Sequence, residues 1–298
     1  MNQSATPVDT FAARRSRFKQ AVLERRGLLL PGVANALGAR IVEDLGFEAI
    51  YLTGAGLANT EFGLPDLGMV TMSEFAEATF RISDACTLPL VVDIDTGFGN
   101  ALNVHRTIRT MERAGAAAVQ IEDQVFPKKC GHFAGKGVIP IAEMTSKIKA
   151  AVDTRIDDNL LIIARTDARA VEGLDAALDR AHAMQEAGAD ILFVEAPTDR
   201  AEIEAISRLP APLLANIVFG GKTPMLPRAE LADMGFSLVL YANAALQATI
   251  RAVSSVLGHL RDTGSLAGIA EQLADFDERQ RVVDKARYDA IAESYKVK

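Results

Sequence analysis

One of the two cysteines lies in a cationic segment that favours acid–base chemistry. Cys130 follows two lysines in the run Lys128-Lys129-Cys130-Gly131-His132. Neighbouring cations lower the pKa of a thiol, so that it exchanges protons near neutral pH. We therefore expect Cys130 to act as an acid or base, with His132 orienting a substrate or tuning the thiol. The alternative, an inert packing cysteine, is disfavoured by the charges around it.

This segment belongs to a long connection, residues 124–140, that contains a proline and several glycines. Loops of this length are usually lids or binding loops. Closure of such a loop would bring Lys128 and Cys130 over a site and exclude water. Lys128 is therefore a candidate catalytic residue, and Gly131 a candidate substrate contact.

Four carboxylates are of the type that holds a hard divalent metal: Asp66, Asp93, Asp95 and Glu122. Asp93 and Asp95 stand two residues apart at the end of an apolar run, where strand alternation would place both on one face. Oxygen ligands suit Mg²⁺, with Mn²⁺ as the alternative ion. Each acid also has an ordinary reading, because Asp95 could cap the next helix and Glu122 could form a salt bridge.

Arg165 follows another apolar run and is a candidate for binding a carboxylate or stabilising an enolate-like anion. Its alternative role is a salt bridge to Asp167 or Glu195. Asn216 would offer neutral hydrogen bonds to a substrate.

The segment Thr53-Gly54-Ala55-Gly56 offers backbone and hydroxyl hydrogen bonds. Its glycine spacing is too short for a dinucleotide fingerprint, and the chain contains no P-loop, so nucleotide binding is not expected.

Eight short apolar runs alternate with segments of helical period, which predicts a (β/α)₈ barrel. The predicted strands are 28–33, 49–53, 89–94, 116–121, 160–164, 191–195, 212–217 and 237–241. The predicted helices between them are 34–45, 73–86, 101–114, 141–153, 173–187, 200–208 and 227–234. A doubly wound open sheet is the alternative, although it normally has fewer strands.

The polar candidates fall where the predicted strands end, which is where barrel enzymes carry their chemistry. They are Tyr51, Thr53, Asp93, Asp95, Glu122, Arg165, Asp167, Glu195 and Asn216. Their side chains should therefore meet at one mouth of the barrel.

The chain has 298 residues and a net charge of −7, which gives no indication of nucleic-acid or membrane binding. No apolar run is long enough to span a bilayer, and the N-terminus lacks a signal-peptide pattern. With two cysteines and no disulfide framework, we expect a cytoplasmic protein. Residues 1–298 read as one barrel domain that ends in a helical extension, about 243–298.

Seven motifs together resemble the isocitrate lyase/phosphoenolpyruvate mutase superfamily. They are Tyr51-Leu-Thr-Gly-Ala-Gly, Gly63-Leu-Pro-Asp66-Leu-Gly, Val92-Asp93-Ile-Asp95-Thr-Gly-Phe-Gly, Gln120-Ile-Glu122-Asp-Gln, Lys128-Lys-Cys-Gly-His132, Ala164-Arg165-Thr-Asp167-Ala and Gly221-Lys-Thr-Pro224. The cysteine loop resembles the carbon–carbon lyase branch, which includes 2,3-dimethylmalate lyase and methylisocitrate lyase.

The resemblance implies roles for single residues. Asp93 would be the direct Mg²⁺ ligand, with the other three acids holding the ion through waters. Thr53, Gly54 and Ala55 would bind the 2-oxo carboxylate end of a substrate. Arg165 would stabilise an enolate.

It also implies an activity and an assembly. Cys130 would protonate the carbanion that cleavage releases from a 2-hydroxy di- or tricarboxylate. The family is homotetrameric, with a C-terminal helix exchanged between subunits. Oxaloacetate decarboxylation or hydrolysis, phosphonate mutase activity and a non-catalytic binding barrel are the alternatives.

One segment departs from the family pattern. Tyr241-Ala-Asn-Ala244 replaces a segment where several lyases and the hydrolases carry Pro-Leu-Ser/Thr. Ala244 lacks the hydroxyl that is associated there with oxaloacetate hydrolysis.

Overall fold

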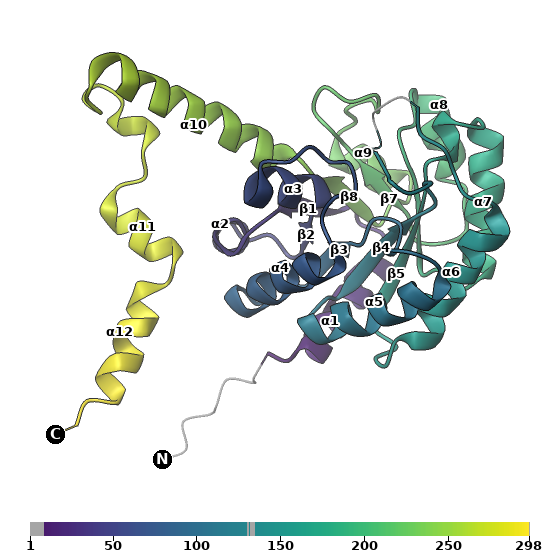
Figure 1. Cartoon of the computed structure of the whole chain (residues 1–298), viewed down its shortest axis with the longest axis horizontal. Coiled ribbons are helices and arrows are strands. Elements are labelled where there is room, and N and C mark those ends of the chain that lie inside the picture. The colour runs from purple at the N-terminus through teal and green to yellow at the C-terminus, as the bar shows by residue number, and fades with distance from the viewer. Residues whose placement is uncertain (1–8, 130, 132–134, 298) are drawn as a thin grey trace.

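Eight parallel strands form a nearly closed barrel (Figure 1). The computed structural model describes residues 9–129, 131 and 135–297. The strands are β1 (Leu28–Val33), β2 (Ile50–Leu52), β3 (Leu90–Asp93), β4 (Ala118–Glu122), β5 (Leu161–Thr166), β6 (Ile191–Val194), β7 (Leu214–Asn216) and β8 (Leu238–Tyr241). They pair in the order β6-β5-β4-β3-β2-β1-β8-β7, and a parallel bridge between Leu192 and Leu213 brings the two end strands together. The predicted barrel is confirmed, and the open sheet is excluded.

Helices surround the strands and continue beyond them. They are α1 (Phe11–Leu23), α2 (Ala36–Asp44), α3 (Gly54–Phe62), α4 (Met72–Ala85), α5 (Ala101–Ala114), α6 (Ile141–Thr154), α7 (Leu174–Glu186), α8 (Arg200–Ile206), α9 (Arg228–Asp233), α10 (Ala244–Thr263), α11 (Phe276–Val282) and α12 (Lys285–Ser294), with short 3₁₀ turns at Ala168–Ala170 and Ala270–Gln272. The seven predicted helices are all present, with ends shifted by a few residues.

Two helices were not predicted, for different reasons. α1 is rich in arginine and presents no clear apolar stripe in the sequence. α3 begins in the glycine-rich segment Thr53-Gly54-Ala55-Gly56, for which only hydrogen bonds to a ligand were predicted. Its start is fixed by Thr53, whose hydroxyl accepts a hydrogen bond from the Gly56 amide at 3.3 Å.

The buried apolar residues form two clusters, which the alternation of the strands separates. One lies inside the barrel and includes Leu161 and Ile163 of β5. The other lies between the strands and the helices and includes Ile162 and Ala164 of the same strand. The side chains that face the barrel interior therefore form a row along each strand, and this row leads to the C-terminal end of the barrel, here called the mouth.

Helix α1 covers the N-terminal end of the barrel. Phe18 and Val22 belong to the cluster inside the barrel. The buried Arg15 donates to the carbonyl of Ala116, next to the start of β4, at 2.9 Å. Lys19 donates to the carbonyl of Asp158, before β5, at 2.8 Å. The helix thus closes the end of the barrel opposite to the polar strand ends.

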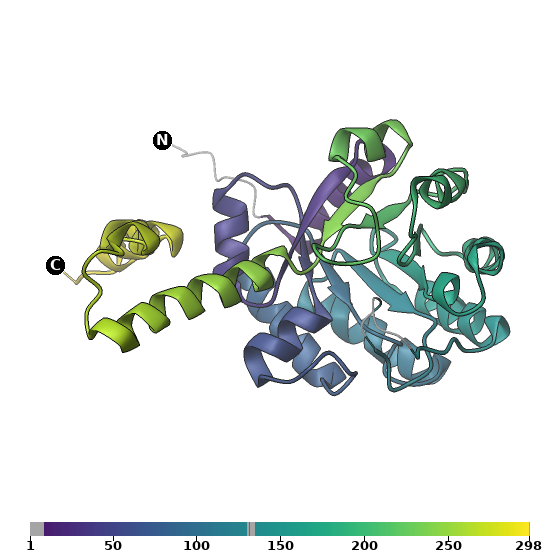
Figure 2. The same cartoon turned by 90° about the horizontal axis from the view of Figure 1, so that it is seen from above.

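Helices α10, α11 and α12 leave the barrel as an extended arm (Figures 1 and 2). None of their residues is buried. Arg281 of α11 forms an ion pair with Asp44 at the end of α2. No helix in the described part of the chain combines the length and apolarity needed to cross a membrane.

We expect Phe18→Ala to lower the free energy of unfolding by about 3–5 kcal/mol, because it leaves a cavity at the closed end of the barrel. Leu23→Ala on the same helix is the matched control, since Leu23 is 58% exposed and Phe18 only 1%. Urea denaturation followed by circular dichroism measures both. Equal losses in the two variants would contradict the role given to α1.

Candidate active site

On several strands the row of side chains that faces the barrel interior ends in a polar residue at the C-terminal mouth of the barrel. On β5, Leu161 and Ile163 face the barrel interior, and Arg165 continues the same row. On β6, Ile191 and Phe193 are followed by Glu195 in the same way. Because all strands are parallel, these ends meet at one place.

A small cavity of about 40 Å³ lies at this mouth. Its lining residues are Tyr51, Thr53, Ala55, Asp66, Asp93, Lys128, Lys129, Gly131, Arg165, Glu195, Asn216, Val218, Leu240, Ala242 and Asn243. The structure therefore brings together most of the predicted substrate-binding residues. The cavity has space for a few water molecules only. A larger ligand requires part of the lining to move, and Lys128, Lys129 and Gly131 of the lining belong to the long connection after β4.

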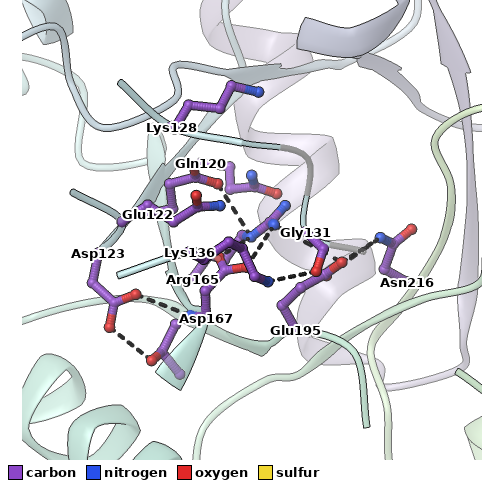
Figure 3. A network of polar contacts seen from close by, with 12 residues as sticks. Gln120, Glu122, Asp123, Lys128, Gly131, Lys136, Arg165, Asp167, Glu195 and Asn216 are labelled. Carbon is purple, nitrogen blue, oxygen red and sulfur yellow. Dashed lines mark hydrogen bonds and ion pairs between the residues drawn. The ribbon is translucent and has the colours of Figure 1, made fainter. Parts of the chain in front are cut away.

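Arg165 is the centre of a buried charge network (Figure 3). Its Nε donates to Asp167 at 2.9 Å and lies 3.2 Å from Glu122 Oε2. Its Nη2 lies 3.8 Å from Glu195 Oε1, and the guanidinium stands 5.1 Å from the centre of the Phe193 ring. The salt bridges considered for Arg165 are thus present, and they hold the guanidinium at the cavity.

The pKa values of this network follow from burial and pairing. Burial disfavours the charged form of Arg165, but Asp167, Glu195 and Glu122 outweigh it and keep its pKa well above the ordinary value. For Asp167, burial raises the pKa, while Arg165 and Lys136 lower it to about 2. Asp167 is therefore a permanent anion at neutral pH.

Lys136 is a member of the site that sequence reasoning missed. Its Nζ donates to Asp167 Oδ1 and to the Gly131 carbonyl, each at 2.5 Å. The side chain is only 2% exposed. A lysine after a glycine in a loop gives no sequence signal of burial, so only the fold reveals the pairing.

The side chains of Asp93 and Asp95 lie close together, although only Asp93 belongs to a strand. Asp93 ends β3, whereas Asp95 lies in the following turn with φ +46°, a left-handed conformation that Asp tolerates. Strand alternation was therefore the wrong reason for grouping them. Their carboxylates still converge, because a Cβ on Gly54 would lie 3.3 Å from both Asp93 Oδ2 and Asp95 Oδ1.

Lys128 lies between two of the predicted metal ligands. Its ammonium forms ion pairs with Asp66 and with Asp95 Oδ1, the latter at 2.9 Å. Burial raises the pKa of Asp95 to about 7, and the charge of Lys128 opposes that rise. Burial alone would lower the pKa of Lys128, but Asp95 and Asp66 raise it well above its ordinary value.

Glu122 has one paired and one unpaired oxygen. Oε2 lies beside Arg165, while the buried Oε1 accepts no hydrogen bond from any described residue. Burial raises the pKa of Glu122 well above its usual range, and Arg165 opposes this. An orphaned carboxylate oxygen of this kind favours a cation or a bound water.

The donors at this mouth fit Mg²⁺ better than a softer ion. Within the described ranges, no three His, Cys, Asp or Glu side chains lie close enough to form a complete metal cage. Mg²⁺ is normally held by one or two carboxylates and keeps several waters, which matches this spacing. Imidazole and thiolate donors, which softer ions require, lie outside the described residues or away from the mouth.

Gln120 connects two predicted site residues and was not itself predicted to act. Its Oε1 accepts a hydrogen bond from the Tyr51 hydroxyl at 2.8 Å, and its Nε2 donates to Asp93 Oδ1 at 3.3 Å. Gln120 therefore orients the carboxylate of Asp93. Gln120 is a polar residue between the apolar Val119 and Ile121 of a buried strand. This pattern was the sequence signal that could have identified it.

Two further contacts complete the site. The Asn216 amide donates to both oxygens of Glu195, at 3.3 and 3.4 Å. Gly54 and Ala55 form the first turn of α3, so their amides face the cavity end of that helix. Cys130 and His132 lie outside the described residues.

Comparison with known proteins places this geometry in a family. A model of the phosphoenolpyruvate phosphomutase family matches residues 18–261. The chain is 39% identical over 281 residues to 2,3-dimethylmalate lyase of Eubacterium barkeri, covering 94% of this chain and 97% of that protein. It is 46% identical over 254 residues to 2-methylisocitrate lyase of Aeropyrum pernix, covering 85% and 82%.

Solved structures agree. A crystal structure of 2,3-dimethylmalate lyase superposes with a TM-score of 0.87 and 33% identity, covering 94% of this chain and 95% of that one. Phosphonopyruvate hydrolase in complex with oxalate and Mg²⁺ gives 0.85 and 30%, covering 95% and 99%. With its barrel, its acidic mouth and these relatives, the chain belongs to the phosphoenolpyruvate mutase/isocitrate lyase superfamily.

Proposed function

We propose that the chain is a Mg²⁺-dependent carbon–carbon lyase. It would cleave a 2-hydroxy di- or tricarboxylate, of the 2,3-dimethylmalate or 2-methylisocitrate type, to pyruvate and a carboxylic acid. The observation that carries the proposal is the cavity, in which Asp93 and Arg165 line one small space. The lyases named among the relatives support this class of reaction.

A metal at this mouth would be held by Asp93 directly and by Asp66, Asp95 and Glu122 through waters. It would neutralise the charge of the 2-hydroxy acid end of the substrate. The amides of Gly54 and Ala55, at the N-terminus of α3, would bind the carboxylate of that end together with Thr53.

Arg165 has a role that depends on its fixed position. Cleavage of the C2–C3 bond leaves negative charge on the departing fragment, and a buried guanidinium stabilises such charge without reorganising. Glu195 and Asn216 hold the neighbouring wall through their hydrogen bonds. Cys130 would deliver a proton to the carbanion, and Lys128 and His132 would complete the loop over the substrate.

Lys136 would fix the base of that loop. Because its ammonium joins the Gly131 carbonyl to Asp167, it ties the residue after Cys130 to the carboxylate that holds Arg165. The proton donor and the anion-binding group would then be positioned by one cation.

The arm composed of α10, α11 and α12 would serve in assembly. Ile250, Val253 and Leu257 of α10 are exposed apolar residues. Such a surface on a helix that leaves its own barrel suits helix exchange between the subunits of a homotetramer. The chain would act as one barrel unit with this arm, in the cytoplasm.

We expect pyruvate release from 2,3-dimethylmalate or 2-methylisocitrate in the presence of Mg²⁺, and none after chelation with EDTA. The assay is run over a panel that adds isocitrate, citramalate and oxaloacetate. Readdition of Mg²⁺ should restore the rate. If only oxaloacetate or a phosphonate were turned over, the lyase assignment would be wrong, although the barrel fold would be unaffected.

We expect Cys130→Ser to lower kcat by about a hundredfold or more, because the hydroxyl is a much weaker acid than the thiol. Mg²⁺ affinity, measured by calorimetry, should not change. Cys86→Ala is the matched control, since Cys86 is buried in the apolar core at the end of α4, where its thiol donates to the Ile82 carbonyl at 3.5 Å. Wild-type turnover in Cys130→Ser would remove Cys130 from the mechanism.

We expect Lys136→Met to lower kcat/KM by about a hundredfold, because small displacements of catalytic groups have effects of that size. Lys149→Met, at an exposed position of α6, is the control.

The same variant should shift acid unfolding. Asp167 has a folded-state pKa of about 2, below its ordinary value, so it stabilises the fold at neutral pH and loses this effect as the pH falls. Without Lys136 the pKa of Asp167 rises, and the midpoint of acid unfolding should move to higher pH. An unchanged midpoint would show that Lys136 does not stabilise the Asp167 anion.

A further inference from the structure

The turn that follows β3 has an unfavourable backbone conformation. Asp95 and Phe98 have φ angles of +46° and +60°, although neither is a glycine. Gly97 and Gly99 of the same turn also have positive φ angles. Asp tolerates this conformation better than most residues, but a residue other than glycine keeps it only where the surrounding structure holds it. The position of the Asp95 carboxylate therefore depends on the contacts that hold this turn.

Three successive carbonyl groups of the turn are held by three different elements. The carbonyl of Asp95 accepts a hydrogen bond from a backbone amide of β4 at 2.9 Å. The carbonyl of Thr96 accepts from Lys147 Nζ of α6 at 3.2 Å, and the carbonyl of Gly97 accepts from Thr107 Oγ1 of α5 at 3.3 Å. The turn is thus fixed by the sheet and by two helices.

Lys147 is an unusual residue for its place in α6. It lies on the buried face of this helix together with Met144 and Ile148, and its side chain is only 4% exposed. Within the described part of the chain, the Thr96 carbonyl is the one atom to which its ammonium donates a hydrogen bond. Glu143 of the same helix forms an ion pair with it at 3.8 Å, which is longer than a hydrogen bond.

The charge of Lys147 is poorly compensated. Burial lowers its pKa, and Glu143 opposes this only in part, because the Glu143 side chain is half-exposed. For Lys128 burial acts in the same direction, but Asp95 and Asp66 raise the pKa well above its ordinary value. A buried cation held mainly by one carbonyl adds little to stability, because its desolvation is costly. An apolar side chain would suit this face of α6 better, which directs attention to the carbonyl that Lys147 holds.

That carbonyl lies next to the pair of acids at the mouth. Thr96 directly follows Asp95, so a change in the direction of its carbonyl changes the backbone that carries the Asp95 side chain. The Asp95 amide in turn donates to Asp93 Oδ1 at 3.1 Å. A movement of the turn would therefore displace both carboxylates together.

We propose that Lys147 is a positioning residue that sets the affinity of the mouth for a divalent cation by holding the Thr96 carbonyl. The inference rests on the metal-dependent function proposed above and adds the contact that keeps Asp93 and Asp95 together. Lys147 acts through geometry, since a positive charge near the site would by itself oppose the binding of another cation. The sign of the effect separates the two: loss of the contact weakens cation binding, whereas loss of the charge alone strengthens it.

Mn²⁺ binding to the full chain, followed by the electron paramagnetic resonance signal of the free ion, tests this without turnover. Lys147→Met should weaken Mn²⁺ binding by about tenfold or more, because contacts that orient metal ligands have effects of this size. Lys147→Arg should restore most of the affinity, since a guanidinium can donate to the same carbonyl and Lys147 borders a cavity of about 630 Å³ that has room for it. Lys149→Met, at an exposed position of the same helix, is the matched control.

Two further measurements separate positioning from a general loss of structure. Thr107→Val removes the hydrogen bond to the Gly97 carbonyl without changing a charge, and it should also weaken Mn²⁺ binding. A misfolded fraction lowers the number of Mn²⁺ sites per chain, but it does not lower the affinity of the remaining sites. In the pyruvate-release assay, excess Mg²⁺ should restore much of the rate lost in Lys147→Met, which a misfolded site would not allow.

Unchanged or tighter Mn²⁺ binding in folded Lys147→Met would overturn the inference and leave the lyase assignment intact. If that variant does not fold, unchanged binding in Thr107→Val overturns it in the same way. Weaker binding in the variants, with no pyruvate released by the wild type from any hydroxy acid, would support the inference and contradict the proposed lyase function. Absence of Mn²⁺ binding in the wild type would overturn both.

Discussion

The buried guanidinium of Arg165 is the constraint on which the mouth of the barrel depends. A guanidinium does not lose its proton in a protein, so its burial requires anions around it. Glu122, Asp167 and Glu195 supply them from the ends of β4, β5 and β6. Three adjacent strands are thereby held in one electrostatic arrangement. Replacing any of these acids would leave charge uncompensated, which explains why so many ionised groups occupy one small space.

The same balance couples the two halves of the site. On one side, Lys128 offsets the charges of Asp66 and Asp95. On the other, Lys136 adds a second cation to Asp167. Both lysines come from the loop that follows β4, so the position of the loop and the charge state of the acids depend on each other. A divalent cation near Asp95 would compete with Lys128 for the same oxygens. Metal binding would therefore change the position of Lys128 and of the loop that carries it.

Much of this arrangement could be predicted from the sequence. Short apolar runs mark the strands and polar residues mark their ends, and both signals are local. The eight strands, the seven helices between and beside them, and the convergence of Asp93, Arg165, Glu195 and Asn216 followed from those signals. Lys136 could not be recognised, since its partner Asp167 lies 31 residues away in the chain, and Gln120 offered only its position on a buried strand as a signal. α3 was missed because its glycines imitate a loop, and Asp95 was grouped with Asp93 for the wrong geometric reason. The partners of Lys136 and Gln120 were missed for one reason: contacts between segments that are distant in the sequence leave no mark on a local stretch of it.

Helix α1 has a consequence for the order in which the chain can fold. It is the first of the described helices to be synthesised, but its partners are made much later. Arg15 bonds to the Ala116 carbonyl, Lys19 to the Asp158 carbonyl, and Phe18 shares its cluster with Leu238 and Leu240 of β8. Contacts of such long range form slowly, because a long stretch of chain must first be ordered. Phe18 and Val22 can therefore be fully covered only after β8 has been made, so this helix is among the last elements to reach its final place.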